Sequence, residues 1–270
     1  MSRAYSLAYL TAADLLPADM IRLAARLGYS NVGIRILPVA PGADFAPLIE
    51  QPERLRETQA AMQDTGVTVF DVEIVRIGAA FKTSDYARFL ETIASLNARA
   101  ILVAGDDTDE ARLTASFAKF CEAARQYNIT ADLEPMPWTE VPNVPTAHRI
   151  VKNAAQPNGG VLIDALHYAR SKSTLTDVAA IPRQHLHYAQ ICDASAEIPN
   201  TTEGLIHTAR NARLLPGDGG IDLRGLFATL PSDIPVSIEI PNNVERARLG
   251  NEEWARRALA AAKRIIEGVV

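Results

Sequence analysis

In the second half of the chain, four apolar runs each end in a polar residue. The side chains of these four residues carry oxygen atoms that can bind a cation. They are Glu134, Asp164, Gln190 and Glu239, at the ends of runs that begin at Ile129, Val161, Leu186 and Val236. Apolar and β-branched residues dominate each run, as in a buried parallel strand, and the polar residue falls where the strand would meet a loop. Three carboxylates in one space need a cation or protons to neutralise them. If the strands are neighbours in a barrel, this pattern predicts a metal site.

The expected ligand set consists of oxygen atoms only, and this decides the kind of metal. Three carboxylates and one carboxamide favour hard or borderline ions, so Mn²⁺ or Mg²⁺ is expected, with Co²⁺ as a substitute, rather than a tetrahedral zinc site. One acidic residue at a strand end is more often a helix cap or a solvated loop charge. Polar residues at four consecutive strand ends favour the metal site.

The elements that must position these residues alternate along the chain. Strands are expected at Ala4–Leu10, Asn31–Leu37, Val67–Val75, Ala100–Gly105, Ile129–Glu134, Val161–Asp164, Leu186–Cys192 and Val236–Ile240. Helical apolar spacing is found at Ala18–Leu27, Pro52–Asp64, Ser84–Leu96, Asp109–Tyr127, Thr146–Ala155, Thr174–Ala180, Leu223–Leu230 and Glu252–Ile266. Such alternation predicts a parallel sheet with right-handed crossovers, and eight repeats allow the sheet to close.

The fold class expected is therefore α/β, with a single (β/α)8 TIM barrel domain over residues 1–270. About 250 residues are typical of such a barrel. An open doubly wound sheet is the competing architecture, but the run Leu10–Asp14 after the first strand lacks the glycines of a dinucleotide-binding turn. Two segments, Pro38–Gln51 and Asp193–Asp222, exceed the usual length of a connection and are expected to cover the substrate.

Composition narrows the class of partner and the compartment. The net charge is −5 and no cluster of Lys and Arg forms a stripe along an expected helix, which argues against nucleic acid and favours a small solute. Cys121 and Cys192 are the two cysteines, both in apolar contexts, so a disulfide framework is not expected. The start of the chain has no long hydrophobic segment, and no run approaches the roughly 18 apolar residues of a membrane span. A cytoplasmic protein is expected.

The motifs around these strand ends resemble those of a known family. They are Glu134 in Asp-Leu-Glu-Pro, Asp164 and His167 in Ile-Asp-Ala-Leu-His, the run Tyr188–Asp193, the loop Arg213–Asp222, and Glu239 in Ser-Ile-Glu-Ile. In order and spacing they resemble the xylose isomerase-like TIM barrels, and best the sugar phosphate isomerase/epimerase group, which includes ketose 3-epimerases and 3-dehydroshikimate dehydratase-like members. The resemblance implies that the four matching residues bind one divalent cation. It also implies that the two glutamates exchange a proton with the substrate.

The chain departs from this family at three places. Gln190 stands where the family usually has His, although Gln occurs there in some members, including bacterial 3-dehydroshikimate dehydratases. The second strand ends in Arg35, where relatives often have Glu. The usual Pro-Gly-Glu-Gly reads Pro-Gly-Asp-Gly at residues 216–219. The last two departures indicate an altered substrate.

The residues also predict a reaction without the family name. A carbonyl and a neighbouring hydroxyl can chelate the cation, which polarises the carbonyl and stabilises the enediolate formed when the adjacent C–H proton leaves. Glu134 and Glu239 can then act as catalytic base and acid on opposite faces. Return of the proton gives epimerisation or isomerisation, whereas loss of a β-hydroxyl gives dehydration. The first expectation is an isomerase or epimerase of a sugar or keto-polyol.

Five further residues are expected to contact the substrate. They are His167, Arg213, Arg35, Arg76 and Trp138. His167 lies three residues beyond Asp164 and can donate a hydrogen bond to a substrate oxygen, and Trp138 can wall a sugar ring. The arginines suit a carboxylate or a phosphate, although Arg35 and Arg76 could instead balance Asp44, Glu73 or Glu140.

Other functions remain open at this stage. A metal-dependent lyase that dehydrates a cyclic hydroxy-keto acid, as 3-dehydroshikimate dehydratase does, is the alternative that Gln190 and the arginines favour. A non-catalytic metal-binding barrel and an abasic-site endonuclease rank lower, the latter because of the acidic composition. The expected partner is a small sugar, keto-polyol or keto acid. Assembly into a homo-oligomer is possible for a barrel of this type.

Overall fold

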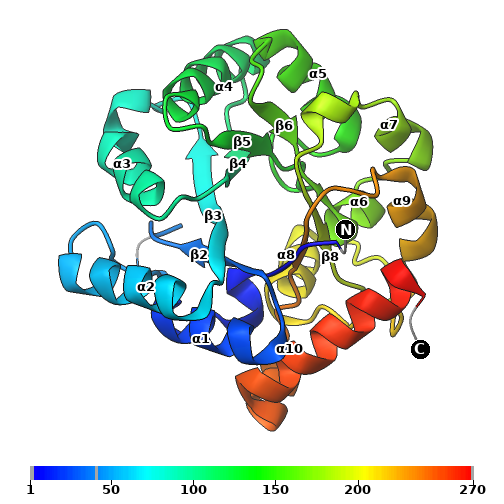
Figure 1. The fold of residues 1–270 in the computed structure, drawn as a ribbon. Helices are drawn as coiled ribbons and strands as arrows, with labels where there is room; N and C mark the ends of the chain where they lie inside the picture. The colour runs from blue at the N-terminus through cyan, green and yellow to red at the C-terminus, as the bar shows by residue number, and fades with distance from the viewer. Residues whose placement is uncertain (1–2, 40–41, 269–270) are drawn as a thin grey trace.

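Short parallel strands form one curled sheet, which the helices surround (Figure 1). The computed structural model describes residues 3–39 and 42–268, so two residues of the expected covering loop Pro38–Gln51, 40 and 41, lie outside the described part. The strands are β1 (Tyr5–Leu7), β2 (Asn31–Arg35), β3 (Thr68–Ile77), β4 (Ala100–Gly105), β5 (Thr130–Leu133), β6 (Gly159–Val161), β7 (Ile163–Asp164), β8 (Ala189–Ile191) and β9 (Val236–Ile238). Their order in the sheet is β6-β5-β4-β3-β2-β1-β9-β8-β7.

The two strands at the ends of this order are halves of one expected strand. We expected a continuous strand at Val161–Asp164, and the structure corrects this expectation because it divides the segment into β6 and β7 at Leu162. Strand β6 pairs with β5, and β7 pairs with β8. Between them, the Leu162 amide donates to the Leu133 carbonyl at 3.1 Å. The chain itself therefore joins the two edges of the sheet. The described residues form the expected TIM barrel, nearly closed and in a single domain.

Helices cover the outside of the barrel (Figure 1). They are α1 (Pro17–Leu27), α2 (Pro52–Thr65), α3 (Ala87–Ser95), α4 (Glu110–Arg125), α5 (Val144–Ala154), α6 (Ala165–Arg170), α7 (Leu175–Ala179), α8 (Thr202–Asn211), α9 (Leu223–Thr229) and α10 (Asn243–Glu267). Short 3-10 turns lie at Tyr9–Ala12, Thr83–Tyr86 and Arg183–His185. We expected Asp193–Asp222 to be a loop, but ten of its residues form α8. No helix in the described ranges is long and apolar enough to cross a membrane.

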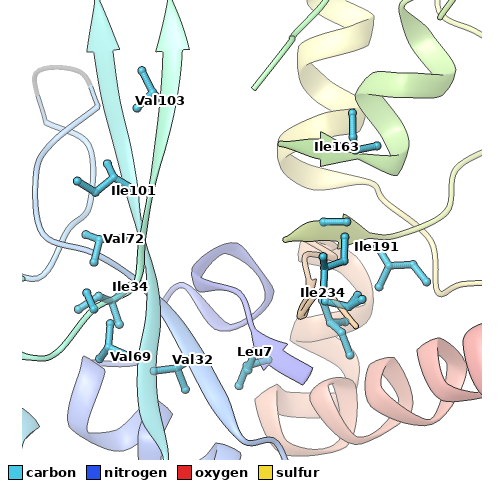
Figure 2. Packing of buried hydrophobic residues seen from close by; sticks show 14 of the residues in the cluster. Leu7, Val32, Ile34, Val69, Val72, Ile101, Val103, Ile163, Ile191 and Ile234 are labelled. Carbon is cyan, nitrogen blue, oxygen red and sulfur yellow. The ribbon is translucent and has the colours of Figure 1, made fainter. Parts of the chain in front are cut away.

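Alternation along the strands creates two buried layers. Leu7, Ile34 and Val103 belong to the large apolar cluster that separates the strands from the helices, as Figure 2 shows. Residues of the other parity point into the barrel, where Leu102 and Tyr188 belong to a second, smaller apolar cluster. Because the strand-end acids have this inward parity, the same alternation that builds the core directs them toward the barrel axis.

The interior contains buried polar groups below the strand ends. His187 Nδ1 lies 2.6 Å from Asp132 Oδ1, and the pair packs against Gly160, where a Cβ atom would overlap both side chains. On β3, Asp71 is buried beside Gly33, and its carboxylate forms no side-chain hydrogen bond with the described residues. These buried side chains fill the space beside Gly160 and Gly33, so the neighbouring strands carry glycine at these two positions.

The first strand and the last helix meet at the end of the barrel away from the strand carboxyl ends. The hydroxyl group of Tyr5 donates to Glu267 Oε1 at 2.8 Å. Gly250, with φ 76° and ψ 160°, divides α10 into two helical segments, and the second segment carries Glu267. Both ends of the described chain are therefore anchored on one side of the molecule.

Candidate functional site

The barrel brings the four expected ligand residues into one buried region. Glu134 directly follows β5, Asp164 ends β7, Gln190 lies in β8 and Glu239 directly follows β9. All four are buried. Asp164 is in register with Gln190, and Gln190 with Ser237, two residues before Glu239. Parallel pairing thus sets these side chains at the carboxyl end of the barrel, where TIM-barrel enzymes have their active sites.

Asp164 has two local partners that fix its orientation. It is the N-cap of α6, and its Oδ1 accepts from the His167 amide at 2.9 Å. This cap places the His167 ring one helical turn above the strand end. Ligand atoms of Glu134, Asp164 and His167 then lie within 4.8 Å of one another, and His167 Nε2 is 3.9 Å from Glu134 Oε1. The separation suits a single ion bound between two carboxylates and an imidazole.

Two buried oxygen atoms at this place lack hydrogen-bond partners among the described residues. They are Glu134 Oε1 and Gln190 Oε1. Gln190 uses its amide nitrogen instead, which donates to Glu239 Oε1 at 3.2 Å. A buried acceptor without a donor is costly, and a divalent cation would satisfy both atoms. The donor set therefore fits the divalent metal expected from the sequence, with His167 within reach as a further ligand.

Arg213 lies between two of the expected ligands. It is 2% exposed, with Nη1 2.6 Å from Asp164 Oδ2 and Nη2 2.9 Å from Glu239 Oε2. Its Nε donates to the Ala209 carbonyl at 2.9 Å, which ties it to α8. We expected a substrate contact, and Arg213 does line the cavity. Its ion pairs add a role as the counter-ion of Asp164 and Glu239, which sequence alone did not predict.

The loop that carries Arg213 is held by Asp193. Its Oδ1 accepts from the amides of Ala194 and Ile221 at 2.8 and 3.1 Å, and its Oδ2 accepts from the Gly217 amide at 2.9 Å. A short antiparallel bridge pairs Asp193 with Leu214. The glycine-rich segment Gly217–Gly220 is thus part of a turn wrapped around the Asp193 carboxylate.

Burial controls the protonation of the acidic groups. Burial raises the pKa of Glu134 well above its usual value, and the charges of Asp164 and Glu239 raise it further. Burial also raises the pKa of Glu239 to about 8, against the opposing effect of Arg213. For Asp164 burial acts in the same sense, but Arg213 and His167 outweigh it and lower the pKa. Without a metal, the environment thus favours the ionised form of Asp164 and disfavours the ionised forms of Glu134 and Glu239.

His167 is held neutral in an aromatic environment. Burial lowers its pKa to about 4, so the ring carries no charge near neutral pH. The Trp138 ring meets it edge to face, with 5.1 Å between ring centroids and an interplanar angle of 81°. Both expected substrate-contact residues line the same cavity. A neutral imidazole can bind a metal or form a hydrogen bond with a substrate oxygen.

Arg35 and Arg76 also line this cavity, and each has a carboxylate partner. Arg35 Nη2 lies 2.6 Å from Glu73 Oε1, and its guanidinium group is 4.5 Å from the centroid of the Tyr9 ring. Arg76 Nη2 lies 2.7 Å from Asp106 Oδ1. Pairing of Arg35 with Glu73 is therefore confirmed, whereas Arg76 pairs with Asp106, which was not expected. Contact of either arginine with a substrate stays a prediction.

The cavity has a volume of about 260 Å³ and lies above the strand ends. It is lined by Leu10, Arg35, Val39, Glu73, Ile74, Arg76, Leu102, Glu134, Met136, Trp138, His167, Ala209, Arg210, Arg213 and Glu239. Glu73 was not expected in the site. Its position near the end of the third expected strand, however, could have predicted that it lies at the same end of the barrel. Arg210 was expected in a loop rather than on a helix that faces the cavity.

The sequence as a whole matches one known protein family. The model of the family described as xylose isomerase-like TIM barrel matches residues 21–265. The chain belongs to that family. The proteins of known activity that this chain resembles include an epimerase, by structure, and a dehydratase, by sequence. The metal-ligand and proton-transfer roles expected above remain proposals for this member.

Individual relatives are distant. A 3-dehydroshikimate dehydratase of Pseudomonas aeruginosa is 27% identical over 150 residues, which are 54% of this chain and 23% of that protein. The chain thus matches under a quarter of the length of this curated relative. Among solved structures, an IolI protein with a bound zinc atom has a TM-score of 0.80 at 16% identity, covering 99% of both chains. D-psicose 3-epimerase of Clostridium cellulolyticum H10, with D-tagatose, has a TM-score of 0.74 at 15% identity, covering 98% and 99%. These two likenesses show the fold.

Proposed function

We propose that this protein is a divalent-metal-dependent isomerase or epimerase that moves a proton next to the carbonyl group of a small sugar or keto-polyol. The observation that carries the proposal is the common position of Glu134 and Glu239, which both line one cavity while unpartnered buried oxygens lie beside them. Two carboxyl groups of raised pKa at a reacting carbon are suited to give and take a proton near neutral pH.

Glu134, Asp164, Gln190 and Glu239 would hold the metal, with His167 either as a ligand or as a substrate contact. The bound ion would supply Lewis-acid polarisation of the substrate carbonyl. Burial raises the pKa values of Glu134 and Glu239, and the charge of a bound ion would oppose this effect, so that one of the two carboxyl groups can be ionised as the base while the other keeps the proton that it gives to the substrate. Mn²⁺ and Mg²⁺ remain the preferred ions for the four oxygen ligands, and participation of His167 would shift the preference toward Zn²⁺ or Co²⁺.

The side chains around the ion would perform the proton transfer. Glu134 and Glu239 come from β5 and β9, which are not adjacent in the sheet, so they approach a substrate from different sides. One accepts the proton and the other returns it to the opposite face or to the neighbouring carbon. His167, neutral and positioned by Trp138, donates a hydrogen bond to the oxygen that gains negative charge.

A second function, dehydration of a cyclic hydroxy-keto acid, has its own support. Two curated relatives are named 3-dehydroshikimate dehydratase, and the cavity of this chain is lined by four arginines that suit a carboxylate. In this case the enediolate expels a β-hydroxyl group as water, with one carboxyl group donating the proton. The atoms balance without an oxidant or a reductant.

Metal content and product formation together test both functions. The purified protein would be assayed for bound metal, and then offered 3-dehydroshikimate and a panel of ketoses with Mn²⁺ or Mg²⁺. Metal-dependent exchange of a ketose proton into deuterated water supports the isomerase or epimerase. A metal-dependent rise of ultraviolet absorbance with 3-dehydroshikimate supports the dehydratase, because dehydration creates a conjugated product. Failure to bind any divalent metal would overturn both.

A further inference from the structure

The mouth of the cavity carries more positive charge than its own carboxylates account for. Arg35, Arg76 and Arg213 each have an acidic partner within 3.0 Å. Arg210, in the last turn of α8, lines the same cavity but forms no ion pair or side-chain hydrogen bond with any residue of the described ranges. One guanidinium group thus faces the cavity with its donors free.

Arg210 is exposed at the mouth of the cavity, and its surroundings disfavour its cationic form. Burial and then the charges of Arg76 and Arg35 lower its pKa, so three guanidinium groups lie close enough to repel one another. An arginine in the last turn of a helix is ordinarily stabilised by the helix carbonyls. That effect does not explain why the side chain faces two further cations across a cavity.

The charges at the mouth of the cavity leave one cation unbalanced. Arg35 pairs with Glu73 and Arg76 with Asp106, whereas Arg210 has no ion pair among the described residues. A monoanionic group on a substrate would neutralise this charge, whereas a neutral sugar would not.

Apolar side chains line the cavity together with the arginines and the expected metal ligands. They are Ile74, Leu102, Met136 and Trp138. The cavity volume of about 260 Å³ is near the lower limit for ligand pockets, which usually begin at about 300 Å³. A small molecule with a hydroxy-carbonyl group for the proposed metal and an anionic group for the arginines matches this lining.

We propose that Arg210 and Arg76 form an anion subsite at the mouth of the cavity, and that the substrate carries a carboxylate or a phosphate group. The inference rests on the proposed function for the reaction that follows binding, but the subsite itself can be tested without turnover. Arg76 keeps Asp106 as a partner on one side of its guanidinium fork, while Arg210 offers its full fork. Arg210 therefore contributes the larger part of the selectivity.

The test is isothermal titration calorimetry with pairs of ligands that lack the reactive carbonyl. Shikimate and methyl shikimate differ by one carboxylate charge, and glucitol 6-phosphate and glucitol differ by a phosphate. Mn²⁺-loaded wild-type protein should bind one anionic member at least about tenfold more tightly than its neutral partner, because a charge-assisted bidentate contact exceeds about 1.4 kcal/mol. Preference for shikimate identifies a carboxylate, and preference for the phosphate ester identifies a phosphate.

Two variants assign the preference to its residue. In Arg210→Gln the affinity for the anionic ligand should fall about tenfold or more while that for the neutral partner stays unchanged. Arg224→Gln is the matched control, because Arg224 is exposed on α9, does not line the cavity and has no ion pair among the described residues. Equal affinity of wild-type protein for both members of each pair, or an undiminished preference in Arg210→Gln, overturns the subsite. An anion preference in protein that binds no metal overturns the proposed function and leaves the subsite standing.

Discussion

Arg213 occupies the position of a counter-ion between Asp164 and Glu239, and its replacement should affect metal-free and metal-loaded protein differently. Arg213→Met leaves two buried carboxyl groups without their cation. We expect the metal-free variant to lose about 3–5 kcal/mol of unfolding free energy, the usual cost of breaking a buried ion pair. Saturating Mn²⁺ should restore a large part of this loss, because the ion supplies the missing positive charge. Urea denaturation with and without metal measures both quantities.

A second substitution serves as the control for this prediction. In Arg213→Met/Asp164→Asn one of the two unpaired charges is absent, so the loss in the metal-free state should be smaller than in the single variant. An equal loss with and without Mn²⁺ in Arg213→Met would show that the residue acts only through packing.

Gln190 is a proposed metal ligand whose role a single substitution can test. Gln190→His should shift the metal preference toward Zn²⁺ and Co²⁺ without abolishing binding, because imidazole suits these ions better than a carboxamide does. Competition titrations of Mn²⁺ against Zn²⁺ measure the shift. Gln184→His introduces the same residue at an exposed position and should leave the preference unchanged. An unchanged preference in Gln190→His would count against Gln190 as a ligand.

At this scale the sequence predicted which residues meet, but not how they are paired. Strand-end positions were sufficient to bring Glu134, Asp164 and Glu239 together, because parallel strands of a barrel end at one face. The pairing of Arg213 with Asp164 joins residues 49 positions apart and depends on where α8 ends. No local pattern carries that information, whereas pairing of Arg35 with Glu73 was one of the alternatives expected from the sequence.

The strands themselves constrain side-chain size at several glycines, among them Gly160 on β6. A Cβ atom there would overlap Asp132 and His187, so the two side chains must move if Gly160 is replaced. We expect Gly160→Ala to cost about 1–3 kcal/mol of unfolding free energy, in the range of overpacked cores. Gly78→Ala, where a Cβ atom meets nothing within 4 Å, is the control. Guanidinium chloride unfolding of both variants checks this, and equal stabilities would contradict it.

Elements with strong apolar periodicity were predicted well, and short or interrupted elements were not. The helix expected at Asp109–Tyr127 is α4, with Asp109 as its N-cap. The division of β6 from β7 at Leu162 was not predictable, because each half is only two or three residues long and is defined by a different neighbour. Helix α8 was missed because its apolar face is weak, with Ala209 as its one buried residue.

For the molecule as a whole, the buried acids set the pH dependence of metal-free stability. Glu239 has a folded-state pKa of about 8 against an ordinary value of 4.5, so between these values the folded state holds a proton that the unfolded state has lost. This stabilisation is present below the unfolded pKa and is lost as pH rises through 8. His167, with a folded-state pKa of about 4, is neutral in both states above its ordinary value of 6.5 and does not oppose the trend there. Stability should therefore fall from pH 6.5 to 8, by up to about 1.4 kcal/mol per pH unit per proton.

Bound metal should reverse this dependence, because the ion binds the deprotonated carboxylates. The rise of the melting temperature on adding saturating Mn²⁺ is expected to be larger at pH 8 than at pH 6.5. Differential scanning calorimetry of chelator-treated and Mn²⁺-loaded protein at the two pH values measures this. In Glu239→Gln the contribution of that carboxyl group is removed, so the slope of the metal-free protein should be shallower. A flat metal-free profile would contradict the assignment.

The hydrogen bond between Tyr5 and Glu267 places the beginning and the end of the described chain side by side, remote from the carboxyl ends of the strands. In a nearly closed ring of strands, any strand can come first in the sequence, provided that the order around the ring stays the same. A short peptide linking these two segments, with new ends in an exposed connection elsewhere, would give a circular permutant with the same ring order. Such a circular permutant should keep the arrangement of the residues at the mouth of the barrel, although the chain begins and ends elsewhere.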